Sequence, residues 1–169
     1  MYSSAGILPF AVVDDKIYLL LGCESTDGTW SDFGGKMETE DGHNPQRTAC
    51  REFMEETLGV VTNFSEINLY IQNSPCLQGC TYSGQKYYMY VVRIQWSPHH
   101  STYFAKAHQL MGRIQPTQRK LLEKRCIRWF SYADILRADR SSVRLRSVFN
   151  DSLLSNINTI NQVFRSVCC

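Results

Sequence analysis

Three glutamates in a short charged stretch form the clearest chemical pattern of the sequence. The stretch reads Arg51-Glu52-Phe53-Met54-Glu55-Glu56-Thr57-Leu58-Gly59-Val60. On an α-helix, with about 100° between successive residues, Glu52, Glu55 and Glu56 fall within about 100° of one another. The apolar residues cover the opposite side: Cys50, Phe53, Met54 and Leu58. We therefore expect three carboxylates on one face of a helix.

The energetics of this cluster argue against a merely solvated acidic face. Glu52 and Glu56 are like charges at i and i+4, which costs roughly 0.2–0.5 kcal/mol. Acids in the last turns also oppose the helix dipole, by roughly 0.3–1 kcal/mol each. Arg51 can pair with Glu55 one turn on, but one arginine cannot neutralise three acids. A hard divalent cation can, because Mg²⁺ binds carboxylates together with the phosphate oxygens of a substrate.

The helix that must hold these acids has clear start and stop signals. Asn44 is a good N-cap, and the Pro45 that follows it suits the first helical position. We expect the helix to run from Pro45 to about Leu58, with Gly59 as its left-handed stop. Before it, residues 30–43 indicate a strand that enters a glycine turn and then a polar loop.

The remaining elements are outlined more coarsely. Apolar runs over residues 6–13 and 16–22 indicate a hairpin. Further elements are expected as strands over 67–71, 86–96 and 126–130, and as helices over 131–136 and 143–164. Two polar stretches are expected to connect them, namely residues 72–85, with Pro75, Gly79 and Gly84, and residues 97–118, which could hold a short helix.

Length and composition bound the class of protein. A chain of 169 residues with 43% hydrophobic and 20% charged residues fits one globular domain over residues 1–169. The first apolar run is broken by Asp14-Asp15 before it could span a bilayer, so we expect neither a signal peptide nor a membrane span. The odd number of cysteines, seven, argues against a disulfide framework and favours the cytoplasm. Cys76 and Cys80 could supply half a zinc site, but no second pair has a matching spacing.

Charge is divided unevenly along the chain. Residues 1–85 hold four basic and twelve acidic residues, whereas residues 86–169 hold fourteen basic and four acidic ones. This division is compatible with a polyanionic substrate that meets a carboxylate-bound metal, and equally with two solvated faces. The basic stretch over residues 113–146 could bind further phosphates or an RNA 5′ end, although it lacks an aromatic platform motif.

The glycine, the acidic loop and the charged helix together resemble the Nudix box. Its usual form is Gly, five residues, Glu, seven residues, and then Arg-Glu-apolar-x-Glu-Glu-x-Gly-apolar; here it covers Gly34 to Val60. The segment Trp129-Phe130-Ser131 before a short helix is also similar to the family. The resemblance implies an α/β (α+β) Nudix fold, with a mixed β-sheet sandwiched between α-helices.

Two departures from the family pattern stand out. His43 takes the place of the first glutamate when the interval of eight residues is counted back from Arg51, so that the loop after Gly35 carries two extra residues. Glu38, Glu40 or Asp41 could substitute for that acid. The second departure is Leu58, an additional residue before the glycine, which should only lengthen the end of the helix.

By resemblance, the chain is expected to be a pyrophosphohydrolase, acting on acid anhydrides in phosphorus-containing compounds. The Gly34 carbonyl would join Glu52, Glu55 and Glu56 around one to three Mg²⁺ or Mn²⁺ ions. Lys36, next to Gly35, would reach a substrate phosphate. Glu56 and Glu123 are the candidate bases that accept the proton of the attacking water, Glu55 acts beside them, and Arg51 neutralises part of the cluster.

The substrate stays open at this point. Nucleoside triphosphates, nucleotide sugars, ADP-ribose, dinucleoside polyphosphates and capped RNA all contain a nucleoside diphosphate linked to another group. Pro75 lies 15 residues after Val60, which resembles a spacing of ADP-ribose hydrolases. The alternatives are a catalytically weak Nudix-fold protein that binds nucleotide or RNA, and an enzyme of the mRNA-decapping type. No property of the sequence predicts the oligomeric state.

Overall fold

A mixed β-sheet forms the centre of the molecule. The structure, a computed structural model, describes residues 2–114, 117, 119–137 and 143–167. Within this part of the chain the sheet has seven strands. They are β1 (Tyr2–Val13), β2 (Lys16–Glu24), β3 (Trp30–Ser31), β4 (Phe33–Lys36), β5 (Cys76–Cys80), β6 (Lys86–Arg93) and β7 (Lys124–Ser131). The expected mixed sheet is confirmed, because β1 pairs parallel with β6 and antiparallel with β2 and β4.

The long strand β1 shares one of its edges between two partners. Residues 10–13 pair with β2, and residues 4–7 pair with β4. The expected hairpin of β1 and β2 is confirmed; Asp14 and Asp15 have φ of 48° and 57°, as a two-residue type I′ turn requires. Because β4 takes over from β2 along the same edge, the glycines of β4 lie beside the N-terminal half of β1.

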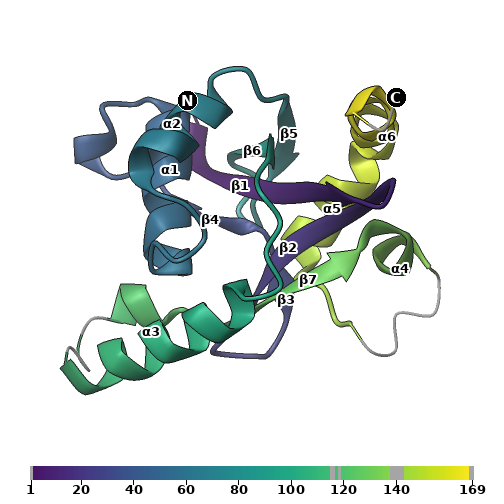
Figure 1. The fold of residues 1–169 in the computed structure, drawn as a ribbon. Helices are drawn as coiled ribbons and strands as arrows, with labels where there is room; N and C mark the ends of the chain where they lie inside the picture. The colour runs from purple at the N-terminus through teal and green to yellow at the C-terminus, as the bar shows by residue number, and fades with distance from the viewer. Residues whose placement is uncertain (1, 115–116, 118, 138–142, 168–169) are drawn as a thin grey trace.

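Helices cover both faces of this sheet (Figure 1). The α-helices are α1 (Pro45–Thr57), α2 (Phe64–Ile71), α3 (His100–Ile114), α4 (Tyr132–Leu136), α5 (Ser147–Ser155) and α6 (Ile157–Val167), and two 3-10 turns are η1 (Thr39–Asp41) and η2 (Arg119–Leu122). One buried apolar cluster joins the sheet to α1, α2 and α3, and a second joins it to α4, α5 and α6. The expected sandwich of a sheet between helices is therefore what the structure shows.

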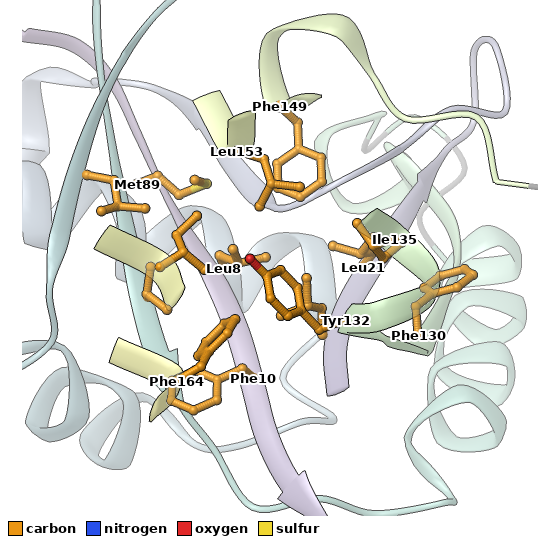
Figure 2. Packing of buried hydrophobic residues seen from close by; sticks show 14 of the residues in the cluster. Leu8, Phe10, Leu21, Met89, Phe130, Tyr132, Ile135, Phe149, Leu153 and Phe164 are labelled. Atoms are coloured by element: carbon orange, nitrogen blue, oxygen red, sulfur yellow. The ribbon is translucent and has the colours of Figure 1, made fainter. Parts of the chain in front are cut away.

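The second cluster is rich in aromatic rings. Phe164 of α6 packs against Phe10 of β1 and Tyr132 of α4, with ring centroids 4.9 and 4.8 Å apart (Figure 2). These three side chains come from distant parts of the sequence, and all are buried. Burial of an aromatic side chain stabilises a fold by several kcal/mol, about 3–5 on truncation to alanine. The C-terminal helices are thus held firmly on the sheet.

One expected strand is a helix. Residues 67–71 were expected to be extended, but they end α2, which begins after Asn63. The Asn63 side chain accepts a hydrogen bond from the backbone N–H of Glu66, which caps the helix. Ile67 and Ile71 are the buried residues of this helix, at the i, i+4 spacing that places both on the core side. The prediction was wrong because a short apolar run does not distinguish a strand from a helix.

Two expected connections contain regular structure. The stretch 72–85 holds β5, an edge strand in which only Leu77 is buried, so its apolar signal is weak. The stretch 97–118 holds α3, a helix of 15 residues rather than a short one. Only His100 and Phe104 of α3 are buried, which explains why the helical period was not visible.

The C-terminal helical stretch is broken once. The apolar spacing predicted one helix over 143–164, whereas α5 ends at Ser155 and α6 begins at Ile157. The side chain of Asn156, between them, donates hydrogen bonds to the backbone carbonyls of Ser152 and Gln78, at 2.9 and 3.0 Å. No helix among the described residues is long and apolar enough to cross a bilayer.

Candidate active site

Helix α1 begins and ends close to where the sequence predicted. The Asn44 side chain accepts hydrogen bonds from the backbone N–H groups of Gln46 and Arg47, at 2.9 and 3.3 Å. The helix ends at Thr57, and both Leu58 and Gly59 have positive φ, 54° and 65°. The left-handed stop therefore begins one residue before the expected glycine. The charged segment lies in the last two turns of this helix.

Arg51 connects the acidic groups of the helix to the loop before it. Its Nη1 donates to Oε1 of Glu52 at 2.9 Å and to Oε2 of Glu55 at 3.3 Å. Its Nη2 donates to the carbonyl of Lys36 at 2.9 Å. The expected pairing of Arg51 with Glu55 is confirmed. Because both carboxylates approach the same nitrogen, they lie side by side at the surface of the helix.

The acid that braces the loop is Asp41, not a residue at position 43. Asp41 is buried and accepts from both Nε and Nη2 of Arg51 at 3.0 Å, and from Thr48 at 2.7 Å. Burial raises the pKa of Asp41, but its hydrogen bonds from Arg51, the Glu38 N–H and Thr48 lower it further, to about 2. This buried acid and the guanidinium fix the loop to the helix.

The placement of Asp41 corrects the register in which this chain resembles the Nudix box. Counted from Gly35, Asp41 stands at the usual interval, so the two additional residues follow the acid instead of preceding it. They are Gly42 and His43, with φ of 62° and 58°, a left-handed turn between the 3-10 turn η1 and the helix. His43 is exposed. Of the three acids that could substitute for the first glutamate, Asp41 is the one that contacts Arg51 through two hydrogen bonds.

Glu52 lies directly against the backbone of Gly35. A Cβ atom added to Gly35 would come within 2.5 Å of the Glu52 carboxyl carbon, so any larger residue would displace this carboxylate from its present position. Glu52 is mostly buried, with 12% of its side chain exposed. Burial raises the pKa of Glu52 to about 7, although Arg51 lowers it, and the charges of Glu55 and Glu123 raise it again. A further cation would favour the ionised form of this group.

Glu56 points into the protein. It has 3% of its side chain exposed, and its Oε2 accepts from the backbone N–H of Gly34 at 2.8 Å. Its other oxygen, Oε1, lies 3.3 Å from Nζ of Lys124. Burial raises the pKa of Glu56 to about 8, even though Lys124 lowers it. The three glutamates thus share one side of the helix but face different neighbours.

Lys124 is a member of the site that the sequence did not reveal. Its Nζ donates to Glu24 at 2.5 Å and to the hydroxyl of Ser31 at 2.8 Å, besides its contact with Glu56. Burial lowers the pKa of Lys124, but Glu56 and Glu24 raise it above the usual value. In the sequence Lys124 was one basic residue among many in 113–146. The sequence indicated a site residue in this region only at its neighbour, Glu123, a candidate base.

The remaining predicted residues surround this core of charges. Glu123 is exposed; its charge acts on Glu52, and its carbonyl accepts from the Ser25 N–H at 2.8 Å. The Lys36 side chain is exposed at the end of β4. The structure therefore brings the predicted site residues to the junction of β4, α1 and the start of β7.

A divalent cation fits this junction only in part. Oxygen donors are the ligands that Mg²⁺ prefers, and the carboxylate of Glu52 lies on a glycine that a larger residue would displace. Among the residues described, no three His, Cys, Asp or Glu side chains converge as a ready metal site. The reason is that Glu52 and Glu55 turn toward Arg51, while Glu56 turns toward Lys124. Glu52 and Glu55 each contact Arg51 through one oxygen, whereas both oxygens of Glu56 contact protein donors, so the first two fit a metal better than Glu56 does.

A cleft of about 300 Å³ opens beside β4. Residues from four segments line it, among them Asp32, Gly35, Lys36, Tyr82, Tyr87 and Arg146. The hydroxyl of Tyr87 donates to Asp32. Burial raises the pKa of Asp32 to about 6, although Tyr87 and Lys124 lower it. The cleft thus combines an acceptor, a half-exposed guanidinium and an exposed tyrosine ring, next to the glycines of the charged junction.

The basic stretch does not act as one group. Lys124 is buried, Arg128 lies over the Phe130 ring at 5.3 Å, and Arg137 pairs with Asp134 at 3.1 Å. Three members of the stretch lie outside the described residues, in whole or in their side chains: Arg119, Lys120 and Arg140. Arg128 and Arg137 therefore contact partners apart from the site of Lys124, and an RNA 5′ end stays a prediction.

Comparison with known proteins identifies the fold. No family model matches the chain, and no curated protein sequence matches it. Among solved structures, the NUDIX domain of Shewanella oneidensis NrtR, complexed with ADP ribose, aligns with 96% of this chain and 87% of its own, at 16% identity and a TM-score of 0.59. A candidate NUDIX hydrolase of Listeria monocytogenes aligns over 96% and 97%, at 12% identity and a TM-score of 0.50.

A third similar structure is the C-terminal domain of mouse MUTYH in complex with human PCNA. It aligns with 94% of this chain and 88% of its own, at 9% identity and a TM-score of 0.50. These identities are low, so the likeness concerns the arrangement of strands and helices. The chain has the Nudix fold.

Proposed function

We propose that this chain is a Nudix hydrolase that cleaves the diphosphate bond of a nucleoside diphosphate linked to another group, with Mg²⁺ or Mn²⁺ as cofactor. The observation that carries the proposal is the Arg51 guanidinium, whose Nη1 holds Glu52 and Glu55 side by side, with Glu52 against the Gly35 backbone. Such a pair of partly exposed carboxylates beside a glycine strand can hold a hard cation and leave room for phosphate. When bound, the ion neutralises charge on the diphosphate and lowers the pKa of the attacking water.

The protein groups divide the remaining work. Glu52 and Glu55 would hold the ion. The family resemblance adds the Gly34 carbonyl and Glu56 as ligands, but both oxygens of Glu56 already contact protein donors. The exposed Lys36 side chain would bind a phosphate oxygen. Glu123 acts on Glu52 through its charge, and its exposed carboxylate is a second candidate, beside Glu56, to accept a proton from water.

The cleft beside β4 would hold the nucleoside part of the substrate. It adjoins Gly35 and Lys36, and its volume of about 300 Å³ lies at the lower end of small-molecule sites. Asp32 can accept hydrogen bonds from amino or hydroxyl groups, and Tyr82 can stack on a base. The ADP ribose in the complex of the NrtR domain makes nucleotide diphosphates the first compounds to test.

The proposal is tested with a panel of diphosphate compounds. Purified protein is incubated with nucleoside triphosphates, ADP-ribose, nucleotide sugars, dinucleoside polyphosphates and capped RNA, with Mg²⁺ or Mn²⁺, and the products are separated by chromatography. We expect a nucleoside monophosphate from at least one of them. Glu52→Gln and Glu56→Gln should fold and lose roughly 10²–10⁴-fold in rate, because each removes a carboxylate near the reacting group.

A matched control separates this effect from a general loss of negative charge. Glu40→Gln changes an exposed acid of the loop before the helix, and it should retain the activity of the wild type. Equal activity of Glu52→Gln, Glu56→Gln and the wild type would show that these glutamates do not take part in hydrolysis.

Nucleotide binding without hydrolysis is the second candidate. It is favoured by the internal pairing of the glutamates, since no ready metal site is formed by the residues that the structure describes. Calorimetry with a nucleotide that the panel leaves intact would support it, provided that no compound of the panel is cleaved with either metal.

A further inference from the structure

The side chain of Lys124 is fully enclosed, although it begins a strand near the surface. Only 1% of it is exposed. Its aliphatic part crosses β2 at Gly22, where an added Cβ atom would lie 2.8 Å from Cδ of the lysine. A glycine at this position of β2 is therefore required for the lysine to reach inward. Gly22 therefore leaves the space through which the Lys124 side chain brings its ammonium group to the centre of the charged junction.

The ammonium group lies between an acid of β2, a hydroxyl of β3 and an acid of α1. Glu24 and Ser31 are within 2.5 and 2.8 Å of Nζ, and Glu56 is within 3.3 Å. Removing an ammonium group from water costs several kcal/mol, which only close and well-oriented acids can offset. Ser31 also donates to Glu24 at 2.9 Å. The side chains of Lys124, Glu24 and Ser31 are therefore each hydrogen-bonded to the other two.

This network makes Glu56 different from the other two glutamates of the helix. Its oxygens are both engaged by protein donors, the Gly34 N–H and Nζ of Lys124. It is 3% exposed, whereas Glu52 and Glu55 are 12% and 27% exposed. An ion from solvent can thus reach Glu52 and Glu55 more readily than Glu56.

We infer that Lys124 is an internal cation, which occupies the innermost cation position of the acidic cluster in place of a divalent ion. Lys124 is then a positioning residue: it holds Glu56 against the Gly34 N–H and leaves Glu52 and Glu55 as the ligands for metal from solvent. The chain accordingly binds fewer divalent ions than its carboxylates could hold. The inference rests on the proposed function, because it assigns the metal to the same site.

The test counts bound ions with and without the ammonium group. Mn²⁺ is titrated into the full-length wild type and the Lys124→Met variant, and free Mn²⁺ is followed by electron paramagnetic resonance. We expect Lys124→Met to bind one more Mn²⁺ per chain than the wild type, because Glu24 and Glu56 lose their internal cation. Its thermal midpoint should also rise more with Mn²⁺ than that of the wild type.

Two further variants keep the test decisive. Lys106→Met makes the same change on an exposed lysine of α3 and should bind as many ions as the wild type. Lys124→Met combined with Glu24→Gln removes one acid with the ammonium group; it should fold more readily and still bind the additional ion at Glu56. If both Lys124→Met variants stay unfolded at saturating Mn²⁺, a divalent ion cannot replace the ammonium group, and the inference is contradicted.

The outcomes separate this inference from the proposed function. If the wild type binds Mn²⁺ and the Lys124 variants bind the same number with equal affinity, the internal cation is refuted and the hydrolase proposal stands. If the wild type and every variant bind no Mn²⁺, the proposed metal site fails, and the inference fails with it.

Discussion

Asp41 stabilises the folded state through a charge that only strong acid removes. The pKa of Asp41 is lowered to about 2, below the value of about 3.9 in an unfolded chain. Its contribution is therefore complete above about pH 4 and is lost as the pH falls toward about 2. We expect Asp41→Asn to destabilise the protein by about 3 kcal/mol at neutral pH, because Arg51 loses a buried partner. Urea unfolding at about pH 7 measures this difference.

The pH dependence supplies the check on Asp41. The difference between Asp41→Asn and the wild type should shrink when the unfolding is repeated near about pH 2.5. Asp151→Asn, at an exposed aspartate of α5, serves as the control and should change stability by less than about 0.5 kcal/mol at either pH. A constant deficit of Asp41→Asn across the range would mean that the carboxylate charge is not what stabilises the loop.

Some contacts of single site residues could be predicted from the sequence, and others could not. Arg51 and Glu55 are one helical turn apart, so their contact followed from spacing alone. Asp41 could only be offered as one of three substitutes, because the left-handed turn at His43 changes how the loop aligns with the helix. Lys124 could not be found, because its acidic partner Glu24 is far away in sequence and meets it only through the pairing of two strands.

Among the elements, α1 depends on its first turn for the position of the charged segment. Asn44 satisfies two backbone N–H groups there. We expect Asn44→Ala to lower the free energy of unfolding by about 1 kcal/mol, because these donors lose their acceptor. Asn63→Ala at the start of α2 is the matched variant, since Asn63 caps only the Glu66 N–H. Chemical denaturation compares both; an unchanged stability of Asn44→Ala would mean that water replaces the cap without cost.

The same two caps explain which elements could be predicted. Asn44 was recognised because Pro45 follows it and a long charged helix comes after. Asn63 was overlooked because only eight residues follow it in α2, and their apolar members also suit a strand. For β5, an edge strand with one buried side chain, periodicity carries almost no signal. Helix α1 could thus be predicted from its cap and its buried face, whereas α2 and β5 are defined only by their packing against the rest of the fold.

In the whole molecule the acidic and the basic halves of the chain meet inside the fold. Lys124 and Arg146, from the basic half, both contact Glu24 of the acidic half, at 2.5 and 3.2 Å. The uneven charge was compatible with a bound polyanion or with two solvated faces. The structure adds a third explanation of the uneven charge, since ion pairs between β2, β7 and the start of α5 neutralise part of it inside the protein.

The cleft is a property of the whole molecule, because β4, the turn between β5 and β6, and the start of α5 each supply a wall. Tyr82 of that turn bonds to Ser147 at the start of α5, which joins two of these walls. If the cleft holds a nucleoside, Tyr82→Ala and Arg146→Ala should weaken the binding of the noncleavable methylene analogue of ADP about tenfold, a loss of about 1.4 kcal/mol. Calorimetry measures the dissociation constant.

The controls for the cleft use residues of the same type elsewhere. Tyr103→Ala, at a half-exposed tyrosine of α3, should bind the analogue like the wild type, since Tyr103 lies outside the cleft. Arg146→Lys should recover part of the affinity lost in Arg146→Ala, because the positive charge is kept while the planar fork is lost. Equal affinity of Tyr82→Ala, Arg146→Ala and Tyr103→Ala would place the nucleoside elsewhere. It would leave the charged junction at Arg51 as the only part of the site supported by geometry.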